Sequence, residues 1–139
     1  MKRLRKPLLS LLVGVALGCG IGPHIDDYNE SLVATALASC ACGGHAVLQF
    51  ASEEECRAKA PPSASEQACI EALFKNVSGE FEVHLDCRTA ANNRYASCLN
   101  SRTCTDLARA QCFLDWLDEI EDCPKFPAEL EKDHNECLN

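Results

Sequence analysis

The segment Cys40-Ala41-Cys42-Gly43-Gly44-His45 holds the side chains best suited to chemistry in this chain. Two thiolates and an imidazole within six residues could bind zinc or copper(I), because these metals favour sulfur ligands, and the glycines would let the backbone curl around the ion. The alternative is that Cys40 and Cys42 are bridged to distant cysteines and that His45 is a solvated loop residue. We prefer the alternative, because an even number of cysteines in an exported chain favours disulfides, and we expect no cofactor.

The other histidines give little support to catalysis. His24 lies near the N-terminus, while His84 and His134 fall on expected helices, and none has a serine or aspartate partner at an informative spacing. A small hydrolase is therefore an alternative that would need a pocket in which His84 or His134 meets a carboxylate. A thiol oxidoreductase would show two cysteines separated by two residues at a helix N-terminus, and this chain has no such pair. We expect a protein that is not an enzyme.

Ten cysteines are spread through the 120 residues that follow Cys19, and they make up about 8 percent of that part. This is close to the density of a disulfide scaffold in a short exported protein. Large aromatic residues are few, with one Trp, two Tyr and five Phe, so crosslinks should supplement a thin core. The cysteines that we expect in disulfides are Cys40, Cys42, Cys56, Cys69, Cys87, Cys98, Cys104, Cys112, Cys123 and Cys137.

The first residues of the chain have the layout of a secretory signal. Four basic residues between positions 2 and 6 precede a ten-residue apolar run, Leu8–Leu17, and then Gly18 and Cys19. At ~1.5 Å per residue this run is about half as long as a helix that spans a bilayer. We expect residues 1–18 to be removed on export.

The sequence Ala16-Leu17-Gly18-Cys19 resembles the bacterial lipobox, in which the cysteine is diacylated and becomes the new N-terminus. The resemblance implies a lipid anchor on Cys19, with acyl chains such as palmitate. It also implies the outer membrane, because Gly20 is not the aspartate that retains lipoproteins in the inner membrane. The match departs from the commonest lipobox at Ala16 and Leu17, and Ala16 and Gly18 also suit ordinary signal peptidase.

The parity of the cysteines favours the lipidated form. If the sulfur of Cys19 carries a lipid, the ten cysteines that remain can all pair in an oxidising compartment. Ordinary cleavage would instead leave a free thiol at the N-terminus. We expect three parts: a signal peptide at 1–18, the lipidated Cys19 with a tether at 19–24, and one disulfide-rich helical domain at 25–139.

The charge of the chain limits its partners. The formal net charge is −8 and becomes −12 when the four basic residues of the signal are removed. Such an acidic surface repels phosphate backbones, so we expect no nucleic-acid partner. It also disfavours anionic headgroups, which leaves the lipid as the attachment to the membrane.

The apolar residues recur at helical spacing from Ile25 onward, and the predicted domain is all-α, with five or six short helices. We expect helices at about 25–41, from Ser52, from Ser63, at 79–99, from Thr103 and at 128–137. The spacing of Ser52 with Glu55 and of Ser63 with Glu66 is that of capping boxes.

Cysteines separated by eleven residues predict a helical hairpin, because eleven residues bring the chain back to within about 20° of one helix face. Cys87 and Cys98 have this spacing, as do Cys112 and Cys123. An antiparallel hairpin could join Cys87 to Cys123 and Cys98 to Cys112, and a rival pairing joins Cys98 to Cys104 and Cys87 to Cys112. The arrangement resembles the twin-cysteine hairpins of the coiled-coil-helix family in topology only.

The helix after Thr103 combines an apolar stripe with an acidic face. We expect the stripe to pack on the core with Trp116 beneath a solvated surface; a partner-binding face is the alternative. The stripe is Leu107, Leu114, Trp116, Leu117 and Ile120, and the acidic residues are Asp115, Asp118, Glu119, Glu121 and Asp122.

In its layout the chain resembles the cysteine-rich helical lipoproteins of Gram-negative bacteria. The expected function is that of a non-enzymatic binding or structural module of the cell envelope, attached to the membrane by its lipid and acting on an envelope protein or ligand. A metal-handling lipoprotein that uses Cys40, Cys42 and His45 is the alternative.

Overall fold

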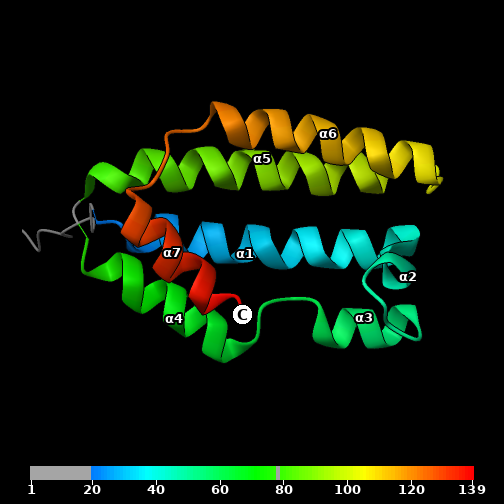
Figure 1. Ribbon diagram of the computed structural model, residues 1–139, viewed down its shortest axis with the longest axis horizontal. Coiled ribbons are helices and arrows are strands. Elements are labelled where there is room, and N and C mark those ends of the chain that lie inside the picture. The colour runs from blue at the N-terminus through cyan, green and yellow to red at the C-terminus, as the bar shows by residue number, and fades with distance from the viewer. Residues whose placement is uncertain (1–19, 78) are drawn as a thin grey trace, which may run out of the picture.

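The computed structural model of the protein describes residues 20–77 and 79–139, so the segment expected to be a signal peptide and the expected lipidation site, Cys19, lie outside the described residues. The elements are α1 (Gly22–Ser39), η1 (Cys40–Gly44), α2 (His45–Val47), α3 (Glu53–Lys59), α4 (Ala64–Lys75), η2 (Gly79–Phe81), α5 (Glu82–Ser101), α6 (Asp106–Asp122) and α7 (Ala128–Cys137). Helix α1 runs through the middle, with α5 on one side and α3 and α4 on the other (Figure 1). Helix α6 packs on α5, and α7 packs on α4.

All regular structure in the described ranges is helical, which confirms the predicted all-α class. Within the same ranges, no helix has both the length and the apolar character needed to cross a membrane.

Two apolar clusters form the core, one near each end of α1. The first joins α1 to α4, α5 and α7, and its members are Ile25, Tyr28, Ile70, Phe74, Leu85, Phe126 and Cys137. The second joins the end of α1 to α5 and α6, and its members are Ala38, Cys42, Ala96, Leu99 and Cys112. Each cluster is small, as the scarcity of large apolar residues predicts.

A buried polar chain crosses the helices beside these two clusters. The side-chain amide of Asn92 on α5 donates to the hydroxyl of Ser31 on α1 over 3.0 Å. The indole nitrogen of Trp116 on α6 donates to the amide oxygen of Asn92, also over 3.0 Å. Asn92 is 4% exposed and Ser31 1% exposed, so these bonds satisfy polar groups that water does not reach.

The helix starts agree in part with the capping patterns of the sequence. Ser63 forms the full capping box with Glu66, as predicted. Ser52 accepts the amide of Glu55, but the Glu55 carboxylate accepts the amide of Ala51 instead of that of Ser52. The prediction that Thr103 caps α6 is wrong, because Thr105 accepts the amide of Ala108.

The first helix begins three residues earlier than predicted. Helix α1 begins at Gly22, because Pro23 suits the first turn of a helix and the side chain of Ile25 is buried in the first cluster. His24 therefore lies on this helix, where its Nδ1 is 2.5 Å from the carboxylate of Asp86 on α5.

Disulfides pair all ten cysteines of the described residues. Two of them hold α5 and α6 in an antiparallel hairpin through the first of the two pairings considered, Cys87–Cys123 and Cys98–Cys112. The others connect segments distant in sequence: Cys40–Cys56, Cys42–Cys104 and Cys69–Cys137. Cys104 is thus used outside the hairpin, which excludes the rival pairing.

The predicted core stripe of α6 is wrong at its three leucines. Leu107 is 80% exposed, Leu114 55% and Leu117 37%. The disulfide from Cys112 to Cys98 turns the opposite side of α6 toward α5, and Trp116 lies on that side. The leucines consequently face away from the hairpin.

Candidate functional site

The alternative metal ligands, Cys40, Cys42 and His45, are not brought together as a thiolate site, and the preferred assignment of both cysteines to disulfides is confirmed. Cys40 is bonded to Cys56 and Cys42 to Cys104, so neither sulfur is a thiolate. His45 begins α2, and its Nδ1 is buried without a hydrogen-bond partner. In residues 20–77 and 79–139, no group of three His, Cys, Asp or Glu side chains has the arrangement of a metal site. The two sulfurs act as crosslinks at this place in the fold.

The backbone around Cys42 is held by Arg109 of α6. Gly43 has a φ of 74°, which interrupts the helical path between α1 and α2, and the carbonyl of the preceding Cys42 lies within reach of α6. Nη1 of Arg109 donates to this carbonyl oxygen over 2.9 Å, while Nη2 pairs with the carboxylate of Asp106. The turn and the start of α6 are therefore joined by both a disulfide and a charged hydrogen bond.

An apolar groove of about 590 Å³ opens between this turn and the α5–α6 hairpin. Its volume lies within the range of about 300–1,000 Å³ that is typical of sites for small ligands. The groove is lined by Ser39, Gly44, Val47, Leu48, Tyr95, Leu99, Asp106, Arg109, Ala110 and Phe113.

The walls of the groove expose apolar side chains that have no cover. Val47 is 68% exposed, Leu48 48% and Phe113 44%. The two charged residues of the lining, Asp106 and Arg109, are paired with each other. An arrangement of this kind suits the binding of an apolar group much better than acid–base chemistry.

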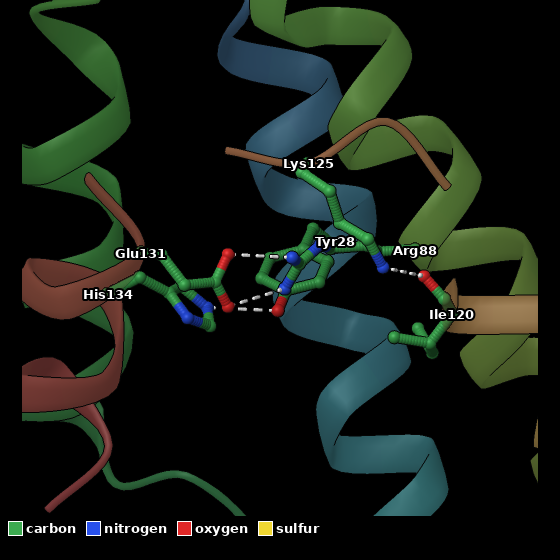
Figure 2. Close-up of polar contacts among 6 residues, drawn as sticks. All are labelled: Tyr28, Arg88, Ile120, Lys125, Glu131 and His134. Atoms are coloured by element: carbon green, nitrogen blue, oxygen red, sulfur yellow. Dashed lines mark hydrogen bonds and ion pairs between the residues drawn. The ribbon is translucent and has the colours of Figure 1, made fainter. Parts of the chain in front are cut away.

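The buried polar contacts around His134 lie in another part of the molecule (Figure 2). The hydroxyl of Tyr28 on α1 is 2.9 Å from Nε2 of His134 on α7. Arg88 of α5 forms an ion pair with Glu131 of α7, with Nη2 at 2.8 Å from the carboxylate. These side chains reach toward one another from three helices and brace them.

Burial is the main cause of the shifted pKa values of His134 and Tyr28. Burial lowers the pKa of His134, and the guanidinium of Arg88 lowers it further. Burial raises the pKa of Tyr28 to about 12. Both side chains are thus neutral at pH 7, and they contribute a hydrogen bond to the core.

The two histidines considered for the hydrolase alternative, either of which would need a carboxylate in a pocket, have different surroundings. His134 is 3% exposed and bonded to Tyr28. His84 stacks on the ring of Phe126 with a centroid separation of 5.4 Å. The groove has no histidine in its lining.

A second, more polar hollow of about 430 Å³ lies between α1 and α4. It contains the carboxylates of Asp26, Glu30 and Glu71, together with Asn29. Glu71 is paired with Lys75 at 3.6 Å, and the carboxylates do not converge as a metal site. The apolar groove is therefore the stronger candidate.

No family model, curated protein or solved structure matches this chain. The candidate site consequently depends on geometry and composition alone.

Several residues of the groove were missed in the sequence. Val47 and Leu48 follow the Cys-Ala-Cys motif in what reads as a loop, and Phe113 stands outside the stripe assigned to the core. The usable signal was the width of the apolar arc on α6, which extends from Leu107 through Phe113 to Trp116 and covers about half of the helix circumference at ~100° per residue. One helix packed on one neighbour does not bury so wide an arc.

Proposed function

We propose that the protein is a lipid-anchored module of the bacterial cell envelope that binds an apolar group of a partner or ligand in the groove and performs no catalysis. The observation that carries this proposal is the exposure of Val47, Leu48 and Phe113 around a preformed apolar groove. Exposed apolar surface that is concave and contiguous costs solubility, and in natural proteins it marks an interaction site.

The crosslinks support the proposed location. Five disulfides use every cysteine between residues 20 and 139, which is what an oxidising compartment outside the cytoplasm favours. This even pairing fits a role for Cys19 as the acylated residue, and we infer a place at the outer membrane on its periplasmic or surface face.

Binding in the groove can be tested with N-phenyl-1-naphthylamine, an uncharged apolar fluorophore. We expect a saturable rise in fluorescence on titration into the oxidised protein. Val47→Asp should weaken this binding by about tenfold or more, because it places a charge in the apolar wall. Val83→Asp is the matched control, since Val83 is also exposed, at 57%, but lies on α5 outside the groove. Equal binding by the two variants, or no saturable binding, contradicts the assignment.

The anchor is tested by mass spectrometry of protein purified from bacterial membranes, before and after alkylation without reduction. We expect a diacylglyceryl adduct on Cys19 and no alkylated thiol. The variant Cys19→Ser should leave the membrane fraction while its five disulfides remain. If the wild-type protein carries no lipid on Cys19, the proposed lipid anchor is wrong. If several thiols are alkylated, the proposed disulfide scaffold is wrong.

A further inference from the structure

We infer that the groove and the adjoining outward face of α6 together dock a basic amphipathic helix of another protein. The outward face is defined as Leu107, Ala110, Leu114 and Leu117. This inference depends on the proposed binding function and specifies the chemistry of the partner.

The outward face has the spacing of a helix-packing seam. Its four residues are separated by three, four and three positions, which is the a/d pattern that receives a second helix. All four are exposed, and the seam from Leu107 to Leu117 is about 15 Å long at ~1.5 Å per residue. A small ligand in the groove would leave most of this seam in water, whereas a helix of three or more turns would cover it.

The groove continues from the seam. Ala110 belongs to both, and Phe113 forms the groove wall one position before Leu114. A helix laid along the seam could therefore insert a large apolar side chain into the groove beside Val47 and Leu48. Central pockets of this kind usually receive the side chains that dominate the binding energy.

The charges along the seam determine what kind of helix fits. Asp115, Asp118 and Asp122 are exposed and lie about 20–80° beyond Leu107 around the helix axis. Arg109 is the only basic residue of α6, which the structure describes throughout, and it is engaged with Asp106 and the Cys42 carbonyl. A second copy of α6 would bring further carboxylates and no free basic residue. A helix with Lys or Arg beside its apolar stripe complements these charges.

The probes for this inference are three synthetic helical peptides of 21 residues. Two share a leucine seam at heptad spacing and carry either Lys or Glu at the flanking positions, and the third is a scrambled version of the Lys peptide. Fluorescence anisotropy with the oxidised protein would give each Kd at 50 mM and 500 mM salt. Leu114→Asp is the test variant, and Val83→Asp is again the control.

We expect the Lys peptide to bind about tenfold or more tightly than the Glu peptide at 50 mM salt, with a smaller ratio at 500 mM because salt screens exposed charges. Leu114→Asp should weaken this binding at least about tenfold, Val83→Asp should not change it, and the scrambled peptide should bind weakly.

Equal affinity for the Lys and Glu peptides, or for the Lys peptide and its scrambled form, would overturn the inference. So would sedimentation data that show a dimer dissociated by Leu114→Asp, because the seam would then belong to a second copy of this chain. If the naphthylamine probe still binds in the groove in these cases, the proposed binding of an apolar group is kept and only the docking of a basic helix is rejected. Loss of both peptide and probe binding rejects both.

Discussion

The indole nitrogen of Trp116 donates a hydrogen bond to the side-chain oxygen of Asn92, and Asn92 in turn donates to Ser31. Three helices are thus joined by one buried amide, because Ser31 lies on α1, Asn92 on α5 and Trp116 on α6. A buried amide bonded at both ends fixes how the helices register with one another, since a slip along any helix axis would leave a polar group unpaired.

Trp116→Phe is expected to destabilise the protein by about 1–3 kcal/mol, because it leaves the buried oxygen of Asn92 without a donor. The free energy of unfolding is measured by urea titration of the oxidised protein. Tyr95→Phe is the control: Tyr95 packs in the same aromatic group, 5.8 Å from Trp116, and no hydrogen bond of its hydroxyl is found in the described residues. Equal losses in the two variants would show that the hydrogen bond of Trp116 contributes no more than a hydroxyl without a partner.

Gly43→Ala is expected to cost about 1–3 kcal/mol, because its φ of 74° is strained for any residue with a Cβ. The added Cβ would also lie 2.8 Å from Nη1 of Arg109 and force the guanidinium to move away from the Cys42 carbonyl. Gly22→Ala is the matched control, since a Cβ there meets no atom within 4 Å. Thermal unfolding of the two variants should separate them, and an unchanged Gly43→Ala protein would contradict this account of the turn.

Phe74→Ala and Leu107→Ala test the division between core and outward face. Phe74 is 0% exposed and packs against Phe126, so its truncation should cost about 3–5 kcal/mol. Leu107 is 80% exposed, so its truncation should change stability by less than about 0.5 kcal/mol. A large loss of stability in Leu107→Ala, measured by denaturant titration of the monomer, would place this leucine in a core.

Acid is expected to destabilise the protein through His134. Because burial lowers the folded-state pKa of His134, the unfolded chain takes up a proton first as the pH falls below ~6.5. The free energy of unfolding should therefore fall between pH 7.5 and pH 5, and His134→Gln should remove this part of the fall at some cost in stability at pH 7.5.

His24→Gln should have the opposite effect on the pH dependence. Its bond to Asp86 raises the pKa of His24, so this histidine stabilises the fold below ~6.5 and loses that contribution as the pH rises through the folded-state value. Urea titrations at the two pH values would distinguish the variants, and identical pH dependence in both would contradict the roles assigned to these side chains.

The fold class and the hairpin could be predicted because local rules determine them. The capping box of Ser63 and Glu66 is complete within four residues, and the eleven-residue steps of Cys87–Cys98 and Cys112–Cys123 follow from helix geometry. The bonds from Cys42 to Cys104 and from Cys69 to Cys137 depend on how distant helices dock, and no local pattern specifies them.

The groove could not be predicted because α6 carries apolar residues over more than one side. A helix seen alone does not show which side faces the core, and the sequence pattern favoured the leucines. The bond of Cys112 to Cys98 decides the question by turning Trp116 inward and Leu114 outward. Val47 and Phe113 line the same groove because the backbone turns at Gly43, which has a positive φ. The sequence alone does not give the path of this loop, so it does not predict that the two residues share a groove.

The length of α1 determines how far the groove lies from the proposed lipid anchor. Gly20, next to the proposed anchor, precedes the helix, and Gly44 of the groove follows its other end, with 18 residues or about 27 Å of helix between them. If α1 stands perpendicular to the bilayer, it acts as a rigid spacer that holds the groove nearly one bilayer thickness above the headgroups. A partner would then meet the protein from the aqueous side, at a height set by a count of helical turns.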